Sequence, residues 1–166
     1  DRPLYERVRF EADAYPNFRH GPVRAGPELA EYRTLPQGYN PRTLEWAAAF
    51  RRRGNFDAAD PGPIVQALMQ HIRTGGYTYT LAAESYGRDS IDEFWLDRRE
   101  GFCEHFAAAF VVVMRALGVP ARVVTGYQGA EPVPVDGYYV VRQSSAHAWA
   151  EYWQRGVGWV RADPTA

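Results

Sequence analysis

Lysine is absent from this 166-residue chain, and cysteine occurs only once. All basic residues are therefore arginines, and with the acidic residues they leave a net charge of −1. A balance this close to zero offers no electrostatic attraction for nucleic acid or an anionic membrane surface, and we expect neither as a partner. One cysteine excludes an internal disulfide. Together with four dispersed histidines it shows no metal-ligand spacing, and no glycine-rich phosphate loop is present, so we expect no metal and no cofactor.

Long apolar runs are also missing. The longest extends from Phe106 to Met114 and is too short to cross a bilayer. Apolar residues nonetheless make up 46% of the chain and aromatic residues 14%, which favours one compact domain that we expect to be monomeric. The chain has no initiator Met and no signal-peptide pattern, so we expect it to be part of a larger protein.

The first part of the chain predicts little regular structure. Residues 1–42 are rich in Pro, Gly and Tyr, and we expect an irregular N-terminal flank packed on the main domain, with one possible strand near Tyr5–Phe10. Residues 43–166 are predicted to form the core. Asn40-Pro41 and Asp60-Pro61 each resemble an N-cap followed by proline at the first helical position.

Two further helices are predicted before the strands begin. Ser90 to Glu93 has the pattern of a capping box and predicts a short helix. The segment from Cys103 to Leu117 is apolar on nearly every side, which is typical of a helix buried at the centre of a domain. Strands are then predicted at 121–127, 138–143, 146–152 and 158–162. Helices followed by strands indicate an α+β fold, with an antiparallel sheet packed on the cysteine helix.

Cys103 is the first candidate for chemistry. It follows a turn and begins the apolar helix, so its sulfur faces the positive end of the peptide dipoles, which favours the nucleophilic thiolate. The alternative is a buried structural cysteine. A lone cysteine followed in sequence by His147 and Asp163 favours the nucleophile.

His147 alternates with alanines in a predicted strand. Alternation places it on one face of the sheet and the alanines on the other, where small side chains let the strand pack closely on a helix. Contact between His147 and Cys103 then requires the twist or the edge of the sheet. The alternative is a structural histidine. His105 is a rival base, but two residues along a helix turn it about 200° away from the thiol, and we expect it to make a structural hydrogen bond.

Asp163 follows the turn Arg155–Gly158. A two-residue turn centred between Gly156 and Val157 would put Asp163 on the face opposite His147, whereas a longer turn or a bulge at Gly158 would put both on one face. The alternative interpretation of Asp163 is a turn-forming Asp-Pro.

Four segments together resemble the transglutaminase-like superfamily, relatives of the papain-like thiol enzymes. They are the cysteine segment 101–107, the following segment 117–127, the histidine segment 146–151 and the aspartate segment 159–165, and they occur in the family's order. Within this superfamily the chain resembles the periplasmic domains of bacterial inner-membrane proteins of the TgpA type, and the flank 35–41 is part of that resemblance. The resemblance implies a transglutaminase-like core with the Cys on a central helix and the His and Asp on the sheet, in a periplasmic domain of a membrane-anchored protein.

The resemblance also implies a reaction. Cys103 would attack a glutamine carboxamide of a protein or peptide, His147 would transfer protons, and Asp163 would orient the imidazole. A primary amine or water would then take the acyl group. The Cys103 N–H would bind the oxyanion, and an upstream aromatic side chain would be the second donor. The candidates for that donor are Tyr79, which we favour, Tyr77 and Trp95.

Two other functions remain open at this point. A cysteine protease or amidase would use the same three residues and differ in the acyl donor and in the access of amines. A non-catalytic binding module is the second alternative, and it would be favoured by the loss of a triad residue.

The absence of lysine generates a first prediction. Transamidation between proteins joins a glutamine to a lysine ε-amine, and this chain has glutamines at six positions but only its α-amine as an acceptor. We therefore expect the tag-free protein, incubated alone, to form no isopeptide-linked oligomers on denaturing gels, even if it is an active transglutaminase. Reduction-resistant ladders in that sample would contradict the prediction. A lysine-rich, glutamine-containing protein added to a parallel sample is the positive control.

Overall fold

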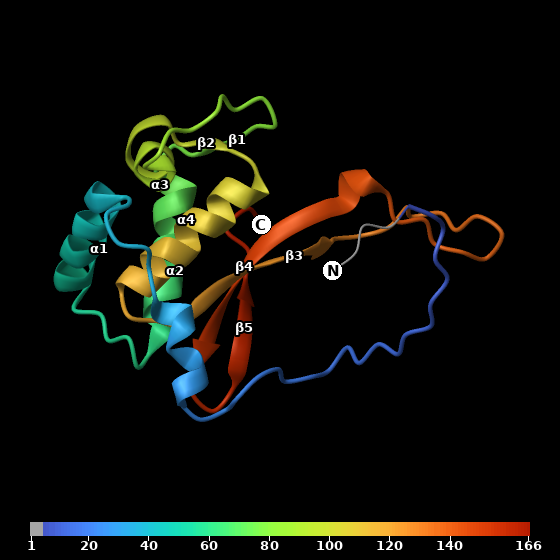
Figure 1. Ribbon diagram of the computed structural model, residues 1–166, viewed down its shortest axis with the longest axis horizontal. Helices are drawn as coiled ribbons and strands as arrows, with labels where there is room; N and C mark the ends of the chain where they lie inside the picture. Colours follow the sequence, from blue (N-terminus) through green and yellow to red (C-terminus); the bar gives the residue numbers. More distant parts are fainter. Residues whose placement is uncertain (1–4) are drawn as a thin grey trace.

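The computed structural model describes residues 5–166; residues 1–4 of the predicted flank lie outside it. The helices are α1 (Pro41–Gly54), α2 (Pro61–Thr74), α3 (Ser90–Asp92), which continues into a π-helical segment (Glu93–Arg98), and α4 (Cys103–Ala116). The strands are β1 (Thr78–Tyr79), β2 (Glu100–Gly101), β3 (Ala121–Tyr127), β4 (Ala146–Gln154) and β5 (Gly158–Ala162). Helices come first and the main strands follow, which confirms the predicted α+β fold (Figure 1).

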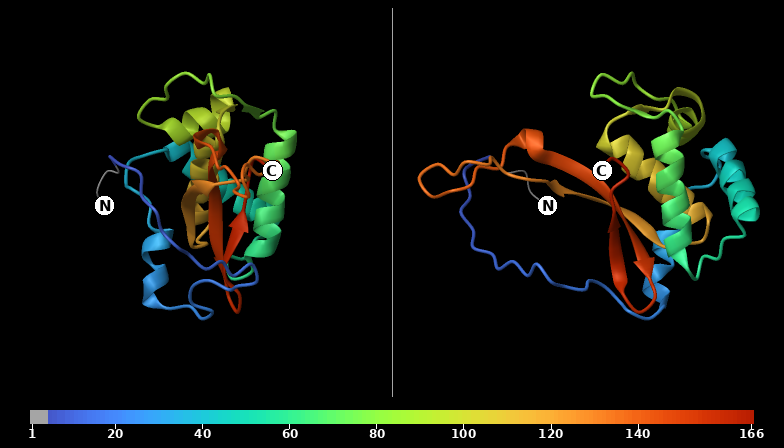
Figure 2. Two further views of the ribbon diagram at one scale, coloured as in Figure 1. Left: turned by 90° about the vertical axis from the view of Figure 1, so that its right-hand side faces the viewer. Right: turned by 180° about the vertical axis from the view of Figure 1, so that it is seen from behind.

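The sheet is antiparallel with strand order β3-β4-β5. One side of α4 packs across this sheet, and α1 packs on the side of α4 that faces away from the sheet (Figures 1 and 2). The alanines of β4 make this close packing possible. Ala148 and Ala150 are 1% and 0% exposed, and Ala162 of β5 is buried beside them. Along α4, Phe110, Val113 and Met114 are fully buried, as expected for a helix covered on most sides.

The N-termini of α1 and α3 are capped by each other rather than by their own residues. The carboxylate of Asp92 accepts the backbone N–H groups of Arg42 and Thr43, with N–O distances of 3.1 and 2.7 Å. Asn40 Oδ1 in turn accepts the N–H groups of Ile91 and Asp92. The predicted capping box at Ser90 is therefore wrong, and Asn40 does not cap α1 with its own side chain. A cap supplied from about fifty residues away leaves no local sequence pattern.

Only part of the N-terminal flank packs on the domain. From Tyr5 to His20 every residue is exposed, and the expected strand near Tyr5–Phe10 does not form. Contact begins at Arg19, which donates to the carbonyl oxygen of Gly156, and at His20, whose carbonyl oxygen accepts the N–H of Trp159. Residues 27–33 form two short 3-10 turns, and Leu29 is buried at 2% exposure.

The predicted strand at 138–143 is also wrong. The segment between β3 and β4 is a projecting loop, in which Val135 and Tyr138 form one isolated bridge (Figure 1). Residues 138–141 are four consecutive β-prone apolar residues, but Tyr138, Tyr139 and Val141 are more than half exposed. Because this segment has no helix to pack on, its β-propensity does not produce a strand.

The mutual capping generates a prediction of stability. Asp92→Ala removes a buried carboxylate and leaves two helix N–H groups unpaired, so we expect the free energy of unfolding in urea to fall by about 2–4 kcal/mol. Asp97→Ala is the matched control, because Asp97 forms only a solvent-exposed ion pair with Arg42, and we expect its loss to lower the free energy of unfolding much less than the loss of Asp92 does. Equal losses in the two variants would contradict the assigned role of Asp92.

Candidate active site

Cys103 is held at the start of α4 by a short ladder between β1 and β2. Tyr79 pairs with Gly101, and the N–H of Thr80 donates to the carbonyl oxygen of Gly101 at 2.7 Å. The thiol is 8% exposed and packs on Ala107 and Ala148, so β4 lies directly beneath it. The N–H groups in the first turn of a helix have no intrahelical acceptor, which leaves that of Cys103 available for a substrate oxygen.

His147 lies near the start of β4, opposite Gly126 of β3. Its Nε2 is 2.8 Å from Oδ2 of Asp163, and the two side chains are only 15% and 9% exposed. A carboxylate can only accept a hydrogen bond, so Nε2 carries the proton and Nδ1 is left as the free base of the neutral ring.

The length of the β4–β5 turn places His147 and Asp163 on the same face of the sheet. Ala150 pairs with Ala162 and Gln154 with Gly158, so the turn has three residues rather than two. Continuing this register puts Asp163 opposite Trp149, on the face that carries His147. Of the two possibilities raised by the sequence, the longer turn is the one that forms.

Every oxygen of the Asp163 carboxylate is occupied. Oδ2 accepts from His147 and, at 3.1 Å, from Arg161, while Oδ1 accepts from the backbone N–H and the hydroxyl of Thr165. Burial by itself raises the pKa of Asp163, but the hydrogen bonds from Thr165, His147 and Arg161 outweigh it and hold the pKa below its usual value. The carboxyl is therefore ionised at neutral pH.

Arg161 and Thr165 were not found by the sequence reasoning. Both lie two residues from Asp163: Arg161 is in β5, and Thr165 lies in the turn that follows the strand. That spacing around Asp163 is the signal that could have identified them.

Three adjoining hollows form a groove past the thiol. The first, of about 120 Å³, is lined by both Cys103 and His147. His147 also lines the second, of about 270 Å³, together with Asp163 and Tyr79. Tyr79 also lines the third, of about 220 Å³, together with Tyr77. The thiol, the imidazole and the carboxylate thus open onto one continuous surface, as a nucleophile, a base and an orienting group require.

Tyr79 is the only predicted oxyanion donor that the structure brings to Cys103 within the described residues. Its hydroxyl lies beside both the thiol and the backbone N–H of Cys103. Partial burial raises the pKa of the Tyr79 phenol, and the negative charges of a Cys103 thiolate and of Asp163 act in the same direction. The hydroxyl therefore keeps its proton and can donate it in a hydrogen bond.

Tyr77 and Trp95 present no donor at Cys103, which corrects their inclusion among the candidate donors. Tyr77 lines the third hollow, but its hydroxyl donates to the carbonyl oxygen of Trp95 at 2.7 Å, and burial raises the pKa of that phenol. Trp95 is 1% exposed, in contact with Trp46 and His71.

His105 points into the protein and not toward the groove. Its Nδ1 accepts the N–H of Phe102 at 3.2 Å, and its ring packs on Phe94 and Tyr86. Burial lowers the pKa of His105, which disfavours its charged form. The structural hydrogen bond expected from helix geometry is therefore present.

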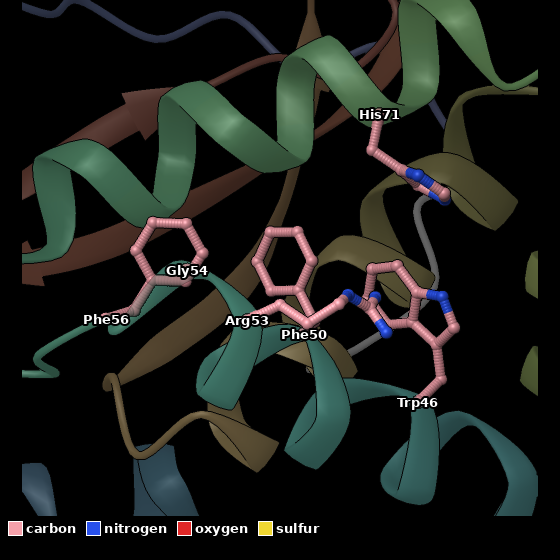
Figure 3. A pocket seen from close by; sticks show the side chains of 6 residues that line it. All are labelled: Trp46, Phe50, Arg53, Gly54, Phe56 and His71. Atoms are coloured by element: carbon pink, nitrogen blue, oxygen red, sulfur yellow. The ribbon is translucent and has the colours of Figure 1, made fainter.

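A separate cavity of about 370 Å³ lies between α1 and α2 (Figure 3). It shares no lining residue with the groove at Cys103, and its walls are aromatic with one guanidinium and one imidazole, from Arg53 and His71. It contains no thiol or hydroxyl that could act as a nucleophile. Within residues 5–166, no three His, Cys, Asp or Glu side chains are grouped so as to hold a metal ion.

Comparison with known proteins agrees with this geometry. Over 131 residues the chain is 45% identical to a Pseudomonas aeruginosa protein named protein-glutamine gamma-glutamyltransferase, covering 79% of this chain and 19% of that protein. The crystal structure of the periplasmic domain of TgpA from Pseudomonas aeruginosa superimposes with a TM-score of 0.79 at 42% identity, covering 86% of this chain and 49% of that one. The chain thus spans about a fifth of that curated relative and about half of the solved domain.

A more distant structure shows the fold alone. A protein from Cytophaga hutchinsonii assigned as a cysteine protease has a TM-score of 0.58 at 21% identity, over 86% of this chain and 44% of that one. The family model described as the transglutaminase-like superfamily matches residues 46–164, which include Cys103, His147 and Asp163. This chain belongs to the transglutaminase-like superfamily.

Proposed function

We propose that this chain is a cysteine acyltransferase that acts on glutamine carboxamides of proteins or peptides. The observation that carries the proposal is the groove in which Cys103 and His147 line one hollow while His147 is bonded to the ionised Asp163. The name of the 45% identical relative supports the choice of a glutamine side chain as acyl donor.

The first half of the reaction forms a thioester. His147 Nδ1 takes the proton of the Cys103 thiol, and the sulfur attacks the carboxamide carbon. When the tetrahedral intermediate collapses, the C–N bond breaks, the imidazolium returns its proton to the nitrogen, and ammonia leaves. Asp163 stays ionised throughout, holds Nε2 protonated and stabilises the imidazolium.

The charge on the tetrahedral oxygen requires donors in fixed positions. We propose the Cys103 N–H and the Tyr79 hydroxyl, because that hydroxyl lies beside both polar groups of Cys103. The β1–β2 ladder fixes their relative positions before any substrate binds.

The second half of the reaction resolves the thioester. A neutral primary amine, or water, loses a proton to His147 and attacks the thioester carbon; the C–S bond breaks and the thiolate recovers the proton. Product identity then depends on which nucleophile reaches the groove. Aminolysis gives a new amide, and hydrolysis gives glutamate.

The relatives also support a cellular setting. We propose that the chain is a periplasmic domain of a larger membrane protein, in keeping with the periplasmic domain of TgpA. No helix in residues 5–166 is both long and apolar enough to cross a membrane.

The proposal is tested by incorporation of a fluorescent primary amine into a glutamine-rich protein whose lysines have been dimethylated. We expect Cys103-dependent labelling by the wild type, and no labelling above background by Cys103→Ala, because no other thiol exists to form the thioester. Release of ammonia without labelling would favour the amidase function. Cleavage of the backbone would favour the protease, and no reaction with either enzyme would contradict the proposal.

The role of His147 is tested against the second histidine near the thiol. We expect His147→Ala to lower kcat/KM for amine incorporation by about 10²–10⁴-fold, the contribution of general acid–base catalysis. His105→Asn is the matched control, since the amide oxygen can still accept the Phe102 N–H, and we expect a change of about twofold or less. A larger loss in the His105 variant, with thermal unfolding unchanged in both, would show that the wrong base has been assigned.

A further inference from the structure

The groove at Cys103 differs in charge between its two ends. The 120 Å³ hollow beside the thiol is lined, apart from Cys103 and His147, by one carboxylate and four small residues: Glu104, Thr125, Gly126, Ala146 and Ala148. At the opposite end, the 220 Å³ hollow is walled by apolar groups such as Ile72, Phe106 and Pro164, and its one charged side chain is Arg73. His147 and Tyr79 lie between the two ends.

Glu104 is not neutralised by a neighbouring cation. Its side chain is exposed, and none of the ion pairs formed among residues 5–166 includes its carboxylate. An acidic residue in the first turn of a helix is stabilised by the helix dipole, which is sufficient to explain its presence but does not use its position at the hollow. The carboxylate is thus free to interact with a ligand that enters beside the thiol.

The hollow that contains Glu104 is where the second substrate can meet both the thioester and its base. The second substrate must reach the thioester carbon on Cys103 and also His147, which has to take its proton. Both of these residues line the narrow hollow that contains Glu104.

Resting on the proposed acyltransferase function, we propose that Glu104 is the specificity-determining residue for the acceptor, and that it selects an amine that arrives as a cation over an uncharged one. A primary alkylamine such as a lysine side chain is protonated at neutral pH, so the carboxylate attracts it to the hollow. The ammonium releases one proton to solvent before it reacts. The neutral nitrogen then attacks the thioester carbon and gives a second proton to His147, which passes it to the departing thiolate as the C–S bond breaks.

The test compares a charged acceptor with an uncharged one. Hydroxylamine is neutral at pH 7, whereas 1,5-diaminopentane is cationic, and both resolve the same thioester formed from a glutamine-rich protein with dimethylated lysines. In Glu104→Gln we expect the ratio of the diamine KM to the hydroxylamine KM to rise about fivefold, which is the effect of losing one partly exposed ion pair. In the wild type the same ratio should rise with salt, and in the variant it should not.

Glu100→Gln is the control for a general change in charge. Glu100 is also exposed and lies three residues before Cys103, but it does not line the hollow. A KM ratio that is unchanged in Glu104→Gln, that shifts equally in Glu100→Gln, or that is insensitive to salt in the wild type would overturn the inference. Equal losses of diamine and hydroxylamine turnover in Glu104→Gln would also overturn it, because they would assign Glu104 to the fold. Absence of hydroxylamine incorporation by the wild type would instead contradict the proposed function.

Discussion

The register of the β4–β5 hairpin is the constraint on which the rest of the site depends. Side chains alternate between the faces of a strand, so a shift of one residue would move Asp163 to the face opposite His147. The three-residue turn prevents this shift. The turn itself is made possible by two glycines with positive φ, Gly156 at +78° and Gly158 at +98°. At Gly158 a Cβ atom would lie 2.3 Å from the carbonyl oxygen of His20, so the N-terminal flank also packs against this turn and fixes it.

The same register controls the packing of the cysteine helix. In the observed register the alanines of β4 face α4, which lets the helix approach until Cys103 touches Ala148. A one-residue slip of β4 against both of its neighbouring strands would direct His147 and Trp149 at the helix and would push α4 away from the sheet. The buried core and the groove therefore select the same register, and the hydrophobic effect positions polar groups that contribute little to stability themselves.

Much of this arrangement could be predicted from the sequence because it depends on local periodicity. The apolar helix after Cys103 and the alternation around His147 have periods that a single segment reveals. What failed was determined by contacts between distant segments. Asn40 and Asp92 cap each other's helices, so neither N-terminus resembles the pattern expected of it. Residues 138–143 have the pattern of a strand but lack a surface to cover. The length of the β4–β5 turn was left open by the sequence, and in the structure this turn packs against the distant carbonyl of His20.

The aromatic cluster explains why Tyr79, and neither Tyr77 nor Trp95, reaches the thiol. Tyr77 and Trp95 are tied to each other by a hydrogen bond and packed against α1 and α2, where they hold β1 in place. Tyr79, two residues further on, is half exposed and lies over the edge of Phe106 at the start of α4. The buried aromatic residues thus act as an anchor whose position delivers Tyr79 to Cys103, and composition alone could not distinguish the anchor from the donor. A rigid anchor matters because an oxyanion donor stabilises the developing charge only if it needs no rearrangement when the charge appears.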